Sequence, residues 1–212
     1  SLANRGVLFL DEFPEFPRHV LESLRGPIED GVVTVSRAAG SLSFPAKFTL
    51  IAAANPCPCG FFGDTTKECT CLPGQIARYQ KRLSGPILDR IDLHVDVPAV
   101  KVEKLTSDSE AESSESIRTR VQKARQAQLD RFERLPFTSN SEISPKEIKL
   151  FCKLDPDSLN LLRAAVSKMQ LSARSYHRVL KVARTIADLE SSADIGVQHI
   201  AEALQFRSRV ES

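Results

Sequence analysis

The sequence predicts an α/β domain, built on a partial parallel sheet with an inserted β-hairpin, followed by an all-helical domain. Two short apolar runs, Val7–Leu10 and 48–54, have the length and continuity of strands buried between helices. A β-branched segment between them, followed by turn residues, is typical of a hairpin. From about residue 141 onward, apolar residues recur at helical spacing. The predicted parts are an α/β part at 1–99, a linker with a charged helix at 100–140 and a helical domain at 141–212.

The composition indicates a soluble globular protein. The chain has 212 residues, of which 42% are hydrophobic and 26% charged, enough to bury one core or one core and a smaller second. Its longest apolar stretches are far shorter than a membrane span, and its amino-terminal residues lack the pattern of a secretory signal. We therefore expect a cytoplasmic protein with no membrane partner. The net charge of +2 argues neither for nor against nucleic acid, so any basic surface has to be local.

The segment between the first two strands predicts a helix and then a hairpin. The helix rests on four apolar residues at helical spacing, and Gly26-Pro27 marks where it would fray. In the hairpin, 32–35 is β-branched, Gly40 is free to adopt positive φ in the turn, and 41–44 returns. A third strand is predicted over 91–97, where apolar and polar residues alternate. The apolar residues of the helix and of this strand are Val20, Leu21, Leu24 and Ile28, and Ile91, Leu93, Val95 and Val97.

The remainder of the chain reads as linker and helices. Residues 101–116 are polar and charged and predict a linker or an exposed helix start, and an amphipathic helix begins near Ile117. Ser144 lies at a cap position, before a proline and three residues before a glutamate, which predicts a capping box. Asp155 precedes a proline in the same way. Two more helices are expected at about 172–189 and 197–206.

Two adjacent acids, Asp11 and Glu12, follow the first predicted strand directly. A carboxylate at the carboxyl end of a parallel strand lies in the crevice where open α/β sheets bind ligands. There, one acid can hold the Mg²⁺ that bridges nucleotide phosphates, and the next can polarise the attacking water, as in a Walker B motif. A strand that simply ends at the protein surface with two acidic residues would have the same sequence. The assignment to a Walker B motif therefore depends on the presence of the other motifs of a nucleotide site.

Three further polar residues lie where a nucleotide site can use them. Asn55 ends the second apolar run and can orient the same water, or it is a loop asparagine before a proline. Arg90 can reach the γ-phosphate of a neighbouring subunit, or it is a structural arginine paired with Asp89 or Asp92. Arg174, near the start of a helix, can reach a phosphate bound between the two domains, or it is a solvated charge.

Four segments, in this order, resemble the motifs of the Mg-chelatase-like AAA+ ATPases of the ComM/YifB type, within the group of magnesium chelatase and MCM helicases: GVLFLDEFPEF, FTLIAAANPCPCG, RLSGPILDRIDLHVDVP and SARSYHRVLKVARTIADLE. By this resemblance Asp11 and Glu12 match Walker B, Asn55 sensor 1, Arg90 the arginine finger and Arg174 sensor 2. Asp11 and Arg174 would then contact the nucleotide, and the helical domain is the lid. The resemblance implies ATP and Mg²⁺ as cofactors and a hexameric ring. In the ComM type it implies a DNA branch-migration helicase of natural transformation and recombination.

The sequence departs from this family pattern at the phosphate-binding loop. No glycine is followed by lysine, so the motif G-x-x-x-x-G-K-[ST] is not present in these residues. Such a loop holds phosphate through consecutive backbone amides and a lysine. We therefore expect a carboxyl-terminal part of a longer protein, which by itself would bind ATP poorly and not hydrolyse it.

The predicted hairpin carries a candidate contact to DNA. In the related helicases such hairpins point into the central channel of the ring, and Arg37, beside the turn, is the residue expected to touch a DNA phosphate. Lys47 is a weaker candidate. A backbone contact suits a translocating motor because it carries no sequence information. A solvated arginine on an exposed hairpin is the alternative.

Four of the five cysteines form two C-x-C pairs, Cys57 with Cys59 and Cys69 with Cys71. Four thiolates in one glycine-rich loop can coordinate a tetrahedral Zn²⁺, although C-x-C is a tighter bite than the usual C-x-x-C. Reduced free thiols and a redox pair are the alternatives. A zinc ion bound by four sulfurs has no open coordination position for a substrate, so such a site would be structural and would hold the loop in one conformation. The fifth, Cys152, is expected in the core of the helical domain.

Two other functions fit the same residues. One is a chelatase-type ATPase that remodels a protein partner for metal insertion into a porphyrin, which the cysteine loop and the basic hairpin weakly oppose. The other is a non-enzymatic, zinc-stapled adaptor whose ATPase features are inherited and idle. The missing phosphate-binding loop keeps this second alternative open.

Overall fold

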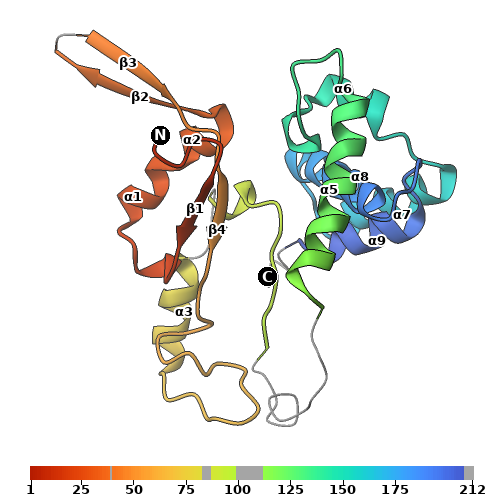
Figure 1. Cartoon of the computed structure of the whole chain (residues 1–212). Helices are drawn as coiled ribbons and strands as arrows, with labels where there is room; N and C mark the ends of the chain where they lie inside the picture. The colour runs from red at the N-terminus through yellow and green to blue at the C-terminus, as the bar shows by residue number, and fades with distance from the viewer. Residues whose placement is uncertain (39, 83–86, 99–111, 208–212) are drawn as a thin grey trace. The chain divides into compact units, whose positions relative to one another are not determined.

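The computed structural model describes residues 1–38, 40–82, 87–98 and 112–207 (Figure 1). They fall into two compact units, Ser1–Ile91 and Asp92–Ser212. Residues 100–111 of the predicted linker lie outside the described residues, as does one residue of the hairpin turn. Within the described ranges no helix is both long and apolar enough to cross a membrane.

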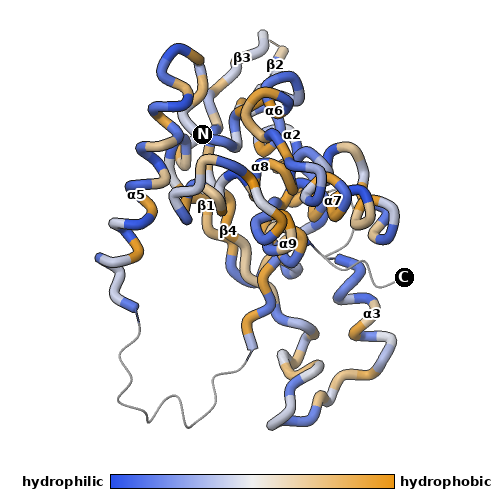
Figure 2. Tube along the Cα trace, turned by 90° about the vertical axis from the view of Figure 1, so that its right-hand side faces the viewer, coloured by the Kyte–Doolittle hydropathy of each residue, from blue (hydrophilic) through white to orange (hydrophobic). Residues whose placement is uncertain are grey.

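The first unit is centred on two parallel strands, β1 (Val7–Leu10) and β4 (Thr49–Ala52), which confirm the two predicted strands. Leu10 packs on a small core formed by Phe13, Leu21 and Ile87. The expectation that helices cover both faces is wrong for the face that carries Val7, Phe9 and Ile51. These side chains are exposed, and Figure 2 shows both strands as apolar segments. In the described part of the unit, therefore, only one face of the sheet has a core against it.

The predicted helix is present as two short ones, α1 (Arg18–Ser23) and α2 (Arg25–Asp30), with the break at Leu24. The break precedes Gly26-Pro27 because Pro27 has no N–H to donate to the carbonyl four residues back. A proline is instead tolerated in the first turn of a new helix. A 3-10 turn, η1 (Phe13–Glu15), connects β1 to α1.

The predicted hairpin is confirmed as β2 (Val32–Arg37) and β3 (Gly40–Pro45), paired antiparallel. Gly40 has φ of +135°, as the turn requires. The hairpin projects away from the parallel sheet (Figure 1) and has two different faces. One face carries the apolar pairs Val33–Phe44 and Val35–Leu42. The other carries two cross-strand hydroxyl pairs, Thr34–Ser43 at 2.9 Å and Ser36–Ser41 at 2.8 Å.

The chain from residue 73 to residue 98 differs from the sequence pattern where the structure describes it. A helix that the pattern does not predict, α3 (Pro73–Arg82), is followed by a 3-10 turn, η2 (Leu88–Arg90). The strand predicted over 91–97 is wrong: residues 91–98 form no strand, and Leu93, Val95 and Val97 are exposed. Alternation gives a segment two faces but does not supply a strand to pair with.

The second unit is helical, and two of its helices start where the cap residues predict. Ser144 and Glu147 form the capping box, and Asp155 accepts from the N–H of Ser158 at 2.7 Å. Ser172 likewise accepts from the N–H of Ser175 at 3.2 Å. The helices are α5 (Ser114–Arg131), α6 (Pro145–Phe151), α7 (Pro156–Lys168), α8 (Ala173–Leu189) and α9 (Val197–Gln205), with a 3-10 turn, η3 (Asn140–Glu142).

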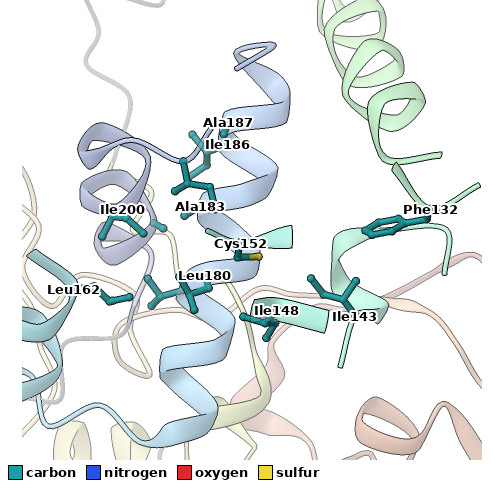
Figure 3. Packing of buried hydrophobic residues seen from close by; sticks show 13 residues of the cluster. Phe132, Ile143, Ile148, Cys152, Leu162, Leu180, Ala183, Ile186, Ala187 and Ile200 are labelled. Carbon is teal, nitrogen blue, oxygen red and sulfur yellow. The ribbon is translucent and has the colours of Figure 1, made fainter. Parts of the chain in front are cut away.

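The core of this unit surrounds α8 (Figure 3). One face of α8 is buried and packs on residues from every neighbouring helix, including Cys152, which is in the core as expected. The fold therefore fits a partial α/β core with an inserted hairpin and a helical lid. The buried residues are Val179, Leu180, Ala183, Ile186 and Ala187 from α8, with Phe132, Ile143, Ile148, Cys152, Leu162, Ile195, Ile200 and Ala203 around it.

A buried polar cluster joins α5 to α8. The carboxylate of Asp188, whose side chain is 1% exposed, accepts from Arg131 at 2.9 and 2.5 Å and from Arg184 at 3.1 Å. The side-chain amide of Asn140 donates to it at 2.8 Å. Both carboxylate oxygens are thus saturated with donors, which offsets the cost of burying the charge.

Candidate nucleotide site and cysteine cluster

The structure brings Asp11, Glu12 and Asn55 to one edge of the parallel sheet. Past the strand ends, the N–H of Ala53 donates to the carbonyl of Leu10 at 2.9 Å, and the N–H of Phe13 donates to Ala53 at 2.9 Å. These bonds keep the two chain segments together just where the polar residues follow. All three polar residues are exposed. The edge therefore offers carboxylate and amide oxygens, the ligand types that suit Mg²⁺.

Glu12 has an unusual backbone. Its φ and ψ are +49° and +43°, in the left-handed region, which costs a residue with a Cβ about 1–2 kcal/mol. Its N–H donates to Oδ1 of Asp11 at 2.9 Å, so the side chain of one acid fixes the backbone of the next. Such strain at an exposed acid beside a strand end is typical of functional positions.

The sequence pattern misses Tyr79, a buried residue of α3 that lies beside this edge. Burial raises the pKa of Tyr79, the carboxylate of Glu15 adds to the rise, and a hydrogen bond from the backbone of Asn55 opposes it. Arg82, one turn further along α3, donates to the carbonyl of Pro14 at 3.3 Å and to Glu15 at 3.2 Å. Helix α3 therefore contacts the backbone of Asn55 through Tyr79 and is joined to η1 by Arg82. The signal available in the sequence was a lone tyrosine on a polar helix, which is weak.

Arg90 is buried in the first unit, with 9% of its surface exposed. Its Nε and Nη2 donate to Oε2 of Glu29 on α2, at 2.9 and 2.6 Å. The sequence suggested Asp89 or Asp92 as the partner of a structural Arg90, and it did not suggest Glu29. Asp92 instead pairs with Arg178 at 3.3 Å.

The other candidate residues belong to α8 and to the hairpin. Arg174 is exposed in the first turn of α8, within the second unit. Arg37 ends β2 at the hairpin turn and is exposed. Lys47 follows β3 at the opposite end of the hairpin, where its stem passes over Gly31, which has φ of +68°. The hairpin thus places Arg37 and Lys47 at different ends, and only Arg37 lies near the tip.

The four cysteines predicted as metal ligands are brought together. Their sulfur atoms all lie within 4.8 Å of one another. Cys57 is fully buried, and the other three are half-buried. A backbone hydrogen bond at Phe61 lowers the pKa of Cys59 to about 5, against the opposing effect of burial. The donor set is that of a tetrahedral thiolate site.

Two family models match the chain, one after the other. The model described as "Magnesium chelatase, subunit ChlI" matches residues 1–105, and the model of the C-terminal part of the same subunit matches residues 111–207. Together they account for nearly all of the chain, and the segment between the two matches lies in the predicted linker.

Curated proteins give the same result. The chain is 45% identical over 211 residues to the competence protein ComM of Haemophilus influenzae, and 43% identical over 209 residues to the protein YifB of Escherichia coli. These matches cover 99% and 98% of the chain but only 40% of each relative. The chloroplastic magnesium-chelatase subunit ChlI of Chlamydomonas reinhardtii is 28% identical over 103 residues, which are 49% of this chain and 19% of that protein. The chain belongs to the Mg-chelatase-like family of ComM and YifB, and it spans about 40% of the length of those two relatives.

Proposed function

We propose that the protein containing this chain is an ATP-driven AAA+ motor that assembles into a hexameric ring and acts on DNA without reading its sequence. Membership of the Mg-chelatase-like family supports an AAA+-like ATPase. The name of the ComM relative, a competence protein, favours a role in DNA uptake and recombination, such as branch migration. The observation that carries the proposal is the shared edge of the sheet, where Asp11, Glu12 and Asn55 follow two adjacent parallel strands.

Each residue of the edge has a distinct role in this proposal. Asp11 would hold Mg²⁺, Glu12 would accept a hydrogen bond from the attacking water and polarise it, and Asn55 would orient the same water. The Mg²⁺ would neutralise charge on the phosphates of ATP. Arg90 would act on the nucleotide of an adjacent subunit, and Arg174 on the nucleotide of its own chain. Phosphate-binding groups outside this chain would complete the site, so hydrolysis is proposed for the whole protein only.

DNA contact is assigned to the hairpin. The tip carries Arg37, and one face presents the hydroxyl pairs Thr34–Ser43 and Ser36–Ser41, which can donate to phosphate oxygens. The opposite face is apolar and would pack on another subunit in the ring.

The test uses the full-length protein. We expect DNA to stimulate its ATPase activity, and Glu12→Gln to abolish hydrolysis while ATP binding is retained. Arg37→Ala should weaken DNA binding and reduce the slope of log affinity against log salt by about 1. Arg18→Ala, which removes an exposed arginine of α1, is the matched control and should leave both unchanged. Hydrolysis that survives Glu12→Gln would refute the assignment of the edge.

The similarity to the ChlI subunit favours one alternative, a chelatase-type ATPase that remodels a protein partner. That alternative predicts hydrolysis that depends on Glu12 but does not respond to DNA or to Arg37→Ala. A full-length protein without ATPase activity would support the adaptor.

A further inference from the structure

The segment between β4 and α3, residues 53–72, contains no helix or strand, although it is long for a loop in a compact unit. Two of its large apolar side chains do not hold it in place, because Phe62 is 47% and Leu72 67% exposed. Something other than a hydrophobic core has to fix this segment. The four cysteines, from both ends of the segment, converge on one point.

The distances between the sulfur atoms fit a metal and not a disulfide. Cys57 Sγ lies 3.4 Å from Cys59 Sγ and 3.7 Å from Cys69 Sγ, and the last two atoms are 3.6 Å apart. A tetrahedral zinc with Zn–S bonds of about 2.3 Å has sulfur atoms about 3.8 Å apart. A disulfide would require about 2.0 Å. The Cys71 sulfur completes the group, within 4.8 Å of the others.

The backbone around the first C-x-C pair is shaped for such a site. The N–H of Phe62 donates to Cys57 Sγ at 3.3 Å, and the N–H of Gly60 donates to the carbonyl of Cys57 at 3.0 Å. Gly60 turns the chain with φ of +85°. Amides directed at sulfur stabilise a thiolate and orient the ligand, as outer-shell groups do in metal centres.

We propose that Cys57, Cys59, Cys69 and Cys71 bind one Zn²⁺, and that this structural centre fixes α3 against the strand-end edge. Four thiolates favour zinc among the divalent ions and leave no open position for catalysis. The centre lies between the two elements it would join. Cys57 comes two residues after Asn55, and Cys71 comes two residues before Pro73, where α3 begins. Binding of zinc itself does not depend on the proposed ATPase function.

The first test is metal content. The chain, purified under reducing conditions without added metal, should contain one equivalent of zinc by elemental mass spectrometry. Cys57→Ser and Cys69→Ser, one from each pair, should each lose most of it, whereas Cys152→Ala should keep it. Well under one equivalent, with the four thiols either free or joined in disulfides, would overturn the proposal.

A second measurement holds even if the cysteine variants fold poorly. The unaltered chain, stripped of metal and reloaded with Co²⁺, should show the visible absorption and sulfur-to-metal charge transfer of a tetrahedral four-thiolate site. On metal removal, amide hydrogen exchange should rise at least tenfold over residues 53–82, including Tyr79, and stay unchanged over 112–207. A six-coordinate cobalt spectrum, or exchange that does not change in α3, would overturn the proposal. These readouts involve no ATP, so they stand or fall separately from the motor function.

Discussion

Arg90 and Glu29 form a partly buried ion pair that joins η2 to α2 in the first unit. Two guanidinium nitrogens of Arg90 converge on one carboxylate oxygen of Glu29, at 2.9 and 2.6 Å. The arginine is 9% exposed, whereas the glutamate side chain is 34% exposed. An arginine that acts on a neighbouring subunit has to be held at a fixed angle, and a carboxylate behind it can do this. An ion pair that only stabilises the fold would have the same geometry. The catalytic and the structural role of Arg90 therefore have to be separated by experiment.

Arg90→Lys separates these roles. Lysine keeps the charge beside Glu29 but cannot donate two hydrogen bonds from a planar group. We expect it to retain most of the stability of the isolated chain and to abolish hydrolysis by the full-length protein. Glu29→Gln should instead lower the stability of the chain by about 1–3 kcal/mol, because it leaves the buried cation with a neutral partner. Denaturant unfolding and ATPase assays measure the two effects. Full hydrolysis by Arg90→Lys would leave Arg90 a structural role only.

Glu12→Gly should stabilise the chain and inactivate the full-length protein. Glycine adopts the left-handed conformation of residue 12 without a Cβ penalty, so relief of strain should raise the free energy of unfolding by about 1 kcal/mol. Glu12→Ala is the matched control, because it removes the same carboxylate but keeps the Cβ. Both variants should lose ATP hydrolysis, and only the glycine variant should melt at a higher temperature. Equal melting temperatures for the two would argue against strain at this position.

The sequence predicts well those structural features that depend on residues close together in the chain. The capping box at Ser144 and the aspartate cap at Asp155 depend on groups three residues apart in the sequence, and both are present as expected. The hairpin also follows from local pattern and from Gly40. The shared edge of Asp11 and Asn55 follows from one general rule, that parallel strands end on the same side.

What the sequence does not reveal depends on distant partners. Glu29 lies 61 positions from Arg90, so the pattern offered only the adjacent aspartates as partners. Helix α3 begins with Pro73-Gly74, which resembles a turn, and it buries little besides Tyr79. The sequence likewise could not predict that one apolar face of β1 is exposed, because a run of apolar residues does not show how many elements cover the strand.

Asp155 gives the second unit a pH dependence. Hydrogen bonds from the backbone and side chain of Ser158 lower the pKa of Asp155 below its ordinary value. A lowered folded-state pKa means that the charged cap stabilises the fold above the ordinary value, about pH 4, and that this contribution is lost as the pH falls further. Asp155→Asn has the shape of the protonated acid. Melting temperatures of the two chains should therefore differ at about pH 7 and converge below about pH 4. A constant difference would mean that the charge of the cap contributes nothing.

Asp188→Asn should be the most destabilising single substitution considered for the second unit. Asp188 is the only anion among the four side chains of its cluster, and Arg184 beside it is 4% exposed. An amide there keeps the size of the side chain but presents two N–H groups to donors that need an acceptor, and it leaves buried guanidinium charge unbalanced. Breaking a buried pair in this way costs about 3–5 kcal/mol, and salt should barely change the loss because the Asp188 side chain is only 1% exposed. Arg120→Ala is the matched control, since its pair with Glu112 is exposed on both sides and should contribute nothing measurable. Denaturant unfolding followed by helical circular dichroism measures both variants. A loss below about 1 kcal/mol for Asp188→Asn would mean that the cluster holds α5 on α8 by packing and not by charge.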